Sequence, residues 1–160
     1  MIPDGFAPHF RSSPLTDPWE PILSRIDHDP DRPAASAVRL GVELRPAHCN
    51  GRGLVHGGLI AALADNAMGL SCALVLGWLE APGLAPRATE APDADPAARR
   101  PRGLLTMSLS VDYVASGRPG QWLELRPKVI RAGRSAAFAE ARIMVDETIA
   151  ARASAVFRTG

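Results

Sequence analysis

The residues with the clearest potential for chemistry lie in one segment, from Asn50 to Asp65, which reads NGRGLVHGGLIAALAD. Its first half is rich in Asn and Gly, which tolerate positive φ angles, and this predicts a loop. Its second half begins a pattern of apolar residues in steps of three and four, which predicts a helix from near 56 to near 77. Asp65 is the only ionisable residue of this helix apart from Cys72. We therefore expect its carboxylate to be largely buried or to line an enclosed cleft.

The carboxylate and the start of the helix supply complementary chemical groups. Asp65 can act as a general base on water or attack as a nucleophile. The first N–H groups of a helix are unpaired and lie at the positive end of its dipole. Gly57 and Gly58 lie there and allow a ligand to come close, so the Gly57 N–H is the candidate donor to an oxyanion. The structural alternatives are a tight turn for the glycines and a hydrogen bond to a neighbour for Asp65.

Two further side chains of this segment are candidate helpers. The amide of Asn50 is predicted to orient an attacking water or to hold the substrate, or else to stabilise its own turn. His56 could bond a substrate carbonyl, or it could only fix the loop at the helix start. The residue types leave both alternatives open.

The elements that must position these groups are strands with a period of two. The first covers 36–45, where alternate residues are apolar. Four antiparallel strands follow residue 104, and the first of them has the apolar set Leu105, Met107, Leu109, Val111 and Tyr113. One long apolar helix with this sheet predicts an α+β fold in which the sheet curls around the helix.

A single domain is expected from a length of 160 residues. Residues 1–34 are predicted to be an N-terminal extension with a short helix. Asp17-Pro18-Trp19-Glu20 is typical of a helix start, and the apolar residues as far as Ile26 would continue it. Residues 80–103 are rich in Ala, Pro and Arg without an apolar period, which predicts an extended or mobile connection that could cover a site entrance.

Composition argues against several classes of function. The net charge of +1 and the scattered basic residues favour neither nucleic acid nor a membrane as a partner. No apolar run is expected to span a membrane and the first residues lack a signal-peptide pattern, so we expect a cytoplasmic protein. Cys49 and Cys72 are not spaced like a redox or zinc motif, and neither a metal nor a cofactor is expected.

The order of these elements resembles the PaaI-like branch of the hotdog-fold thioesterases, in the 4-hydroxybenzoyl-CoA thioesterase superfamily. The shared pattern is N-x-x-G-x-x-H-G-G followed by L-x-D, here Asn50, Gly53, His56, Gly57, Gly58, Leu63 and Asp65. The resemblance extends over about 36–158, and TMSLSVDYV is similar to the family's central strand. It implies a hotdog fold and hydrolysis of an acyl-CoA, with an acidic catalytic residue at Asp65. It also places a helper hydroxyl at Thr106, which could instead be a solvated strand residue.

The spacing of Gly57 and Asp65 predicts an assembly. They are eight positions apart on one helix, which is about 12 Å at 1.5 Å per residue, so one thioester carbon cannot meet both. Two antiparallel copies of the helix, related by a two-fold axis near Ala61, would place Gly57 of one beside Asp65 of the other. We therefore predict an obligate homodimer with two equivalent interfacial sites, as the resemblance also implies. Whether two dimers pair into a tetramer is left open.

Substrate contacts are also expected outside the reacting groups. Gly58 is a candidate because it lies beside the oxyanion donor. CoA carries phosphates, and the predicted hairpin with Arg131, Gly133 and Arg134 offers guanidinium and N–H groups that could bind them. An ordinary basic hairpin is the alternative.

Other functions fit the residues less well. Cys49 beside His48 lacks an orienting third group for a cysteine hydrolase. His48 and His56 lack further ligands at metal-binding spacing. A hotdog dehydratase arranges its His and carboxylate differently. A non-catalytic acyl-CoA-binding or sensor module remains as the alternative, although binding alone would not need a buried Asp65.

Overall fold

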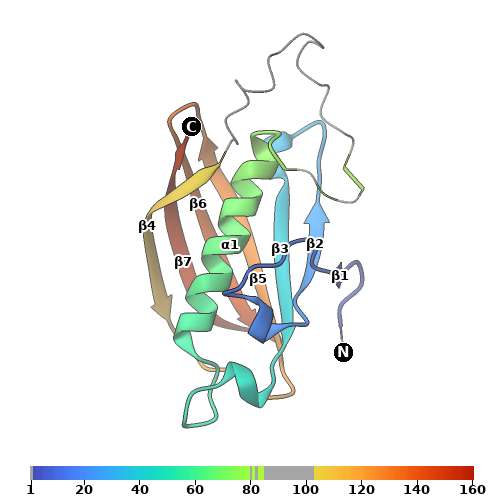
Figure 1. The fold of residues 1–160 in the computed structure, drawn as a ribbon, viewed down its shortest axis with the longest axis vertical. Coiled ribbons are helices and arrows are strands. Elements are labelled where there is room, and N and C mark those ends of the chain that lie inside the picture. Colours follow the sequence, from blue (N-terminus) through green and yellow to red (C-terminus); the bar gives the residue numbers. More distant parts are fainter. Residues whose placement is uncertain (1, 80, 82, 85–102) are drawn as a thin grey trace.

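The computed structural model describes residues 2–79, 81, 83–84 and 103–160, and the features below concern these residues. Within them, antiparallel strands form one sheet in the order β1-β2-β3-β5-β6-β7-β4, which curls around the helix α1 (Figure 1). This is the predicted α+β hotdog architecture. The strands are β1 (Ala7–Pro8), β2 (Leu23–Asp27), β3 (Ala37–Glu43), β4 (Leu104–Tyr113), β5 (Trp122–Ala132), β6 (Ala136–Val145) and β7 (Thr148–Thr159).

Helix α1 (Gly57–Val75) follows the predicted span closely. Its apolar face packs against the concave side of the sheet, and the buried residues include Leu59, Ile60, Leu63, Ala67, Met68 and Leu74. The chain leaves the helix at Gly77, whose φ of 66° costs glycine no steric strain. By length and apolar composition α1 could also cross a membrane, contrary to the expectation that no run has this length. Its burial against the sheet is that of the core helix of a domain.

A buried hydroxyl joins α1 to the sheet. Ser71 Oγ donates to the carbonyl oxygen of Ala67 over 2.7 Å and accepts a hydrogen bond of 2.9 Å from the N–H of Val38 on β3. The hydroxyl thus pairs a buried N–H of β3 that would otherwise lack an acceptor. The contact helps to determine how α1 lies on the sheet.

Strand β4 lies at the edge of the sheet and contains a β-bulge. Thr106 pairs with Phe157 and Ser108 with Val156 of β7, so Met107 is an extra residue. Before the bulge the even-numbered residues of β4 share a face with the buried residues of β7, and after it the odd-numbered residues do. The inward set is Leu104, Thr106, Leu109, Val111 and Tyr113. The predicted apolar face is therefore correct only after the bulge, and Leu105 and Met107 are 55% and 63% exposed.

The N-terminal residues correct a second prediction. The expected helix is limited to one 3-10 turn (Asp17–Trp19), and Leu23–Asp27 forms strand β2 instead. Pro21 explains the difference, because the residue before a proline is disfavoured in the helical region, and Glu20 is extended with ψ of 148°. Strand β2 then pairs along β3. The connection predicted at 80–103 lies almost entirely outside the described residues.

Candidate active site

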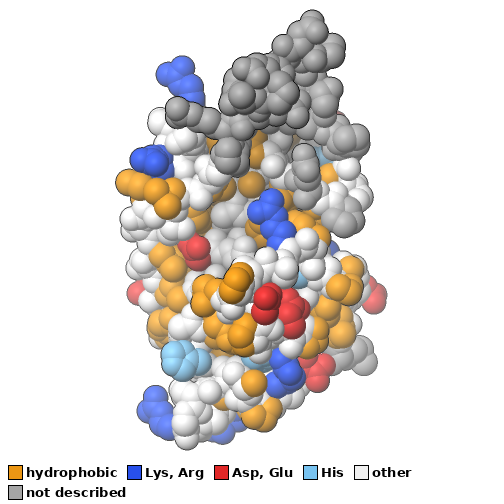
Figure 2. Space-filling view, viewed as in Figure 1, with side chains coloured by type: hydrophobic (Ala, Val, Ile, Leu, Met, Phe, Trp, Pro, Cys, Tyr) orange, Lys and Arg blue, Asp and Glu red, His pale blue; other side chains and the backbone are white. Residues whose placement is uncertain are grey.

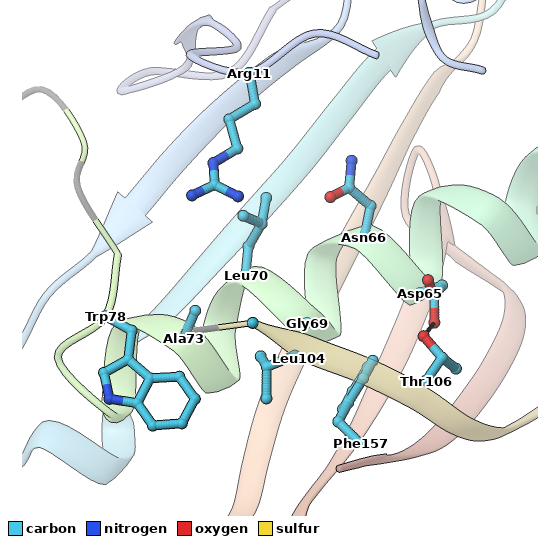
Figure 3. Close-up of a pocket in the computed structure, with 11 residues that line it drawn as sticks. Arg11, Asp65, Asn66, Gly69, Leu70, Ala73, Trp78, Leu104, Thr106 and Phe157 are labelled. Carbon is cyan, nitrogen blue, oxygen red and sulfur yellow. Dashed lines mark hydrogen bonds between the residues drawn. The ribbon is translucent and has the colours of Figure 1, made fainter. Parts of the chain in front are cut away.

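Asp65 lies in the middle of α1 and faces strand β4. The hydroxyl of Thr106 donates a hydrogen bond of 2.8 Å to Asp65 Oδ1 (Figure 3). Thr106 can reach the helix because it precedes the bulge and lies on the inward face of β4. Asp65 is half-buried and lines a cleft, so the expectation of a largely buried carboxylate is wrong. The structure thus brings together the predicted acidic residue and the predicted helper hydroxyl.

The peptide group between Gly57 and Gly58 is oriented from both sides. Its carbonyl oxygen accepts a 2.7 Å hydrogen bond from the hydroxyl of Tyr113. Its N–H, which belongs to Gly58, donates to Nδ1 of His56 over 2.9 Å. His56 is therefore the N-cap of α1, and the Gly58 N–H is occupied. The N–H of Gly57 makes no hydrogen bond with the described residues and lies at the positive end of the helix dipole.

Asn50 makes the contacts of its structural alternative. Its Oδ1 accepts hydrogen bonds from the N–H groups of Arg52 and Leu54, over 2.9 and 3.3 Å. The backbone N–H of Asn50 donates to the carbonyl oxygen of Leu54 over 2.8 Å. These bonds stabilise the loop that leads into α1. A role of the Asn50 amide toward substrate stays a prediction.

A cleft of about 220 Å³ opens beside Asp65 and follows α1 toward its C-terminal end. Figure 2 shows this face hollowed, with a basic and an acidic side chain on opposite sides of the hollow. The helix contributes residues spaced by about one turn, and the sheet contributes apolar side chains opposite them. The lining residues are Arg11, Asp65, Asn66, Gly69, Leu70, Ala73, Trp78, Gly103, Leu104, Thr106 and Phe157 (Figure 3).

The structure keeps Gly57 and Asp65 apart within one chain, because α1 is a regular helix between them. The residues of α1 on the same side as Asp65, which are Gly58, Ala61 and Ala62, are not fully buried. The outer edge of the neighbouring strand β4 pairs with no described strand. The chain therefore presents a small-residue helix face beside an open strand edge.

The predicted phosphate-binding hairpin is present between β5 and β6. The Gly133 N–H donates to the carbonyl oxygen of Ala136 over 2.9 Å, so this N–H is not available to a ligand. Arg131 and Arg134 are exposed and form no ion pair with a described carboxylate. Phosphate binding at this hairpin stays a prediction, and it rests on the two guanidinium groups.

His48 and Cys49 do not form a catalytic pair. His48 is buried, its Nδ1 accepts the N–H of Arg45 over 3.1 Å, and its Nε2 donates to the carbonyl oxygen of Trp19 over 3.0 Å. Burial lowers the pKa of His48, which favours the neutral ring of a structural residue. The Cys49 thiol instead lies 3.5 Å from the carbonyl oxygen of Arg45. In the described ranges, no three His, Cys, Asp or Glu residues are grouped to bind a metal ion.

Sequence reasoning missed several residues of the cleft. Asn66 and Gly69 follow Asp65 by one and four positions, so the helical pattern could have placed them near it. Trp78 follows the helix and had no such signal. Arg11 comes from the N-terminal segment that crosses in front of α1 (Figure 1), and no local pattern predicts that contact.

The sequence of the chain is similar to those of known proteins. A family model described as "Thioesterase superfamily" matches residues 52–151. The chain is 34% identical over 156 residues to a Pseudomonas aeruginosa protein named "Putative esterase PA0474", covering 98% of this chain and 96% of the relative.

Two solved structures share the fold at low sequence identity. A mutant of the phenylacetic acid degradation protein PaaI from Thermus thermophilus has a TM-score of 0.62 and 17% identity, covering 91% of this chain and 98% of that chain. The protein smu.793 from Streptococcus mutans, solved bound to acetyl CoA, has a TM-score of 0.59 and 17% identity, covering 86% of this chain and 88% of that chain.

Proposed function

Because the chain belongs to the thioesterase superfamily, we propose that it hydrolyses an acyl-CoA or a related acyl thioester to the free acid and the thiol. The family and the esterase relative indicate a hydrolase of thioesters or esters. The acetyl CoA bound by the Streptococcus mutans protein of the same fold supports CoA as the carrier. One observation carries the proposal: Asp65, bonded by Thr106, lies at a cleft with room for an acyl group.

The chemistry follows from two groups of the Asn50–Asp65 segment, the Asp65 carboxylate and the Gly57 N–H. Asp65 removes a proton from water as the water oxygen adds to the thioester carbon, or its own oxygen attacks that carbon. The carbonyl oxygen becomes an oxyanion and accepts a hydrogen bond from the Gly57 N–H. Collapse breaks the C–S bond, and the thiolate leaves and takes up a proton. In the second case the product is a mixed anhydride, which water then hydrolyses to the acid.

The proposed site joins two chains. Gly57 and Asp65 lie about 12 Å apart along α1, so a single chain cannot supply both groups to one carbon. A two-fold axis near Ala61 would pair the small-residue faces of two α1 helices and bring the open edges of two β4 strands together. An open strand edge with exposed Leu105 and Met107 is a ready partner for a second copy. We therefore include an obligate homodimer in the proposal.

The function is tested by assaying the purified protein against a panel of acyl-CoA thioesters, with Asp65→Asn beside it. We expect wild-type turnover of at least one thioester and a loss of about 10² to 10⁴ in kcat for the variant, the usual contribution of a general base. Normal hydrolysis by Asp65→Asn would remove the assigned role. Tight acyl-CoA binding without turnover by the wild type would favour a sensor module.

The shared site is tested by mixing two inactive variants. Gly57→Pro removes the candidate N–H donor while proline remains acceptable at the first helical position, and the half-exposed Tyr113 ring beside it can move aside. A heterodimer of Gly57→Pro and Asp65→Asn would contain one intact site and one doubly altered site. Random re-association of equal amounts should recover about a quarter of wild-type activity. No recovery, with heterodimers present by mass spectrometry, would place both groups in one chain.

A further inference from the structure

Arg11 brings a positive charge into the cleft beside Asp65. Its side chain extends from the N-terminal segment toward α1 and lies next to Leu70, on the same side as the amide of Asn66 (Figure 3). The family match begins at residue 52, so Arg11 lies outside the matched region. The proposed function does not use Arg11.

The backbone around Arg11 is anchored on both sides. Before it, the N–H of His9 donates to the carbonyl oxygen of Ile22 over 2.9 Å, and Phe10 packs against the core. After it, the N–H of Thr16 donates to the carbonyl oxygen of Ser13 over 2.9 Å, and Thr16 is buried. The backbone on both sides of Arg11 is thus held in place, while the Arg11 side chain itself is exposed and lines the cleft.

No carboxylate in the described part of the chain forms an ion pair with the guanidinium of Arg11. Arg25 and Arg39 pair with Asp27, and Arg126 pairs with Glu124, at N–O distances of 2.9 Å or less. Arg11 forms no such ion pair with any described carboxylate, including Asp65 of the same cleft. A guanidinium at a cleft is well suited to a carboxylate, which it can bind with two parallel hydrogen bonds.

The helix rise between two lining residues estimates the length of acyl group that the cleft can hold. Leu70, which lines the cleft together with Arg11, follows Asp65 by five positions, or about 7.5 Å along the helix axis. An extended chain advances about 3.5 Å for every three bonds, so this distance corresponds to roughly six bonds. In a thioester of a six-carbon dicarboxylic acid, six bonds separate the thioester carbon from an oxygen of the free carboxylate.

We propose that Arg11 determines substrate choice by binding a carboxylate at the far end of the acyl group, so that the preferred substrates are thioesters of medium-length dicarboxylic acids. This rests on the proposed thioesterase function. The apolar side chains of Leu70, Leu104 and Phe157 contact the methylene groups between the two ends. A neutral acyl group of the same length leaves the guanidinium without its partner and binds less well.

The test compares adipoyl and hexanoyl thioesters, which have the same length and differ in the terminal carboxylate. Each is assayed as the CoA thioester and as the N-acetylcysteamine thioester, which lacks the CoA phosphates. In Arg11→Gln, the ratio of kcat/KM for adipoyl to that for hexanoyl should fall about ten- to one-hundredfold with both carriers, the value of a hydrogen bond to a charged group. Arg11→Lys should keep part of the ratio. Arg142→Gln, an exposed change on the outer face of β6, should leave it unaltered.

The remaining outcomes separate a failure of this inference from a failure of the proposed function. One is that Arg11→Gln lowers kcat/KM equally for both CoA thioesters and leaves it unchanged for both N-acetylcysteamine thioesters. In that case Arg11 binds a CoA phosphate and the inference is wrong. An equal loss with both carriers, or no loss, also overturns it. If the wild-type protein hydrolyses none of the four thioesters but cleaves others in the panel, the substrate class is wrong and the proposed function stands. If it cleaves no thioester at all, the proposed function itself fails.

Discussion

Thr106 and Tyr113 are seven residues apart on β4, yet both side chains face α1, because the extra residue Met107 shifts the alternation between them. Thr106 donates to the carboxylate of Asp65, and Tyr113 donates to the carbonyl oxygen of Gly57. One edge strand therefore contacts both groups of the proposed chemistry, the Asp65 carboxylate and the Gly57 peptide. This relationship leads to two predictions about activity.

Removing the Tyr113 hydroxyl should loosen the start of α1. In Tyr113→Phe, the Gly57–Gly58 peptide keeps only the His56 contact of its two side-chain hydrogen bonds. We expect kcat to fall about three- to tenfold, because one hydrogen bond contributes about 1 kcal/mol, with a smaller change in KM. Steady-state kinetics measures both constants. An unchanged kcat would show that the peptide needs no second contact to stay in place.

Removing the Thr106 hydroxyl should lower kcat, because the Asp65 carboxylate loses a hydrogen-bond donor. Thr106→Val keeps the shape of the side chain but cannot donate to Asp65 Oδ1, and a hydrogen bond to a charged group contributes about 1.5–3 kcal/mol. We expect kcat to fall about ten- to one-hundredfold. Thr106→Ser, which keeps the hydroxyl, is the matched control and should retain most of the activity. Equal activity of the two variants would argue for a solvated strand residue.

Adding one methyl group at Gly69 should narrow the cleft without disturbing the fold. A Cβ at Gly69 would lie 3.5 Å from the Phe157 ring, which is an ordinary contact. We expect Gly69→Ala to melt at or above the wild-type temperature, because alanine favours a helix by about 1 kcal/mol over glycine.

Gly69→Ala should also change the preference for acyl groups of different size. Relative to acetyl-CoA, kcat/KM for long or branched acyl-CoA thioesters should fall. The contrasting change is Gly41→Ala, whose Cβ would collide with the buried Trp122 ring and destabilise the fold by about 1–3 kcal/mol. An unchanged acyl preference in Gly69→Ala would place the acyl group elsewhere.

Removing the buried hydroxyl of Ser71 should destabilise the contact between α1 and β3. In Ser71→Ala the N–H of Val38 loses its acceptor in the core, which costs about 1–3 kcal/mol. Urea unfolding measures the change, with the exposed Ser154→Ala as a control expected within about 0.5 kcal/mol of wild type. A wild-type midpoint for Ser71→Ala would mean that another group replaces the hydroxyl.

Stability should decrease in weak acid because of His48. Burial lowers its pKa in the folded chain, and the positive charge of Arg45 also lowers it, against the opposing effect of the Trp19 carbonyl. The unfolded chain, with an ordinary His pKa of 6.5, then binds a proton more readily than the folded chain. The stability is complete above pH 6.5 and is lost as pH falls toward the lower folded value.

Thermal melting between pH 7 and pH 5 tests this. The melting temperature of the wild type should fall across this range, and His48→Gln should show a shallower decline from a lower starting value. His28→Gln, at an exposed position, should follow the wild-type slope. Burial also lowers the pKa of His9, so part of the slope should remain in His48→Gln. Parallel curves for wild type and His48→Gln would exclude His48 as a source.

The helix and its carboxylate could be predicted because their signals are local. The steps of three and four define α1, and Asp65 interrupts an otherwise apolar pattern. The period of two is equally clear in β6 and β7, where the alternate residues Ala137, Ala139, Ala153 and Ala155 are all buried. The contact of Thr106 with Asp65 agrees with the position that the family resemblance indicated.

The features that were not predicted depend on pairing across the fold. The bulge at Met107 is defined by the register of β4 with β7, and no local pattern in TMSLSVDYV predicts an extra residue. Strand β2 was interpreted as a helix because the Asp17-Pro18 signal is strong, while its pairing with β3 depends on residues far away in the chain. Arg11 reaches the cleft by the same kind of distant contact, for which neither periodicity nor a motif exists.

The separation of Arg11 from the Asn50–Asp65 segment has a consequence for engineering and for evolution. The reacting groups and the cation that faces them are encoded in different parts of the gene, and Arg11 belongs to a segment that covers the helix without forming part of it. Mutations at the exposed positions 11, 12, 14 and 15 can therefore accumulate without disturbing the hydrolytic groups. A library randomised at these four exposed positions would sample new acyl preferences on an unaltered catalytic scaffold.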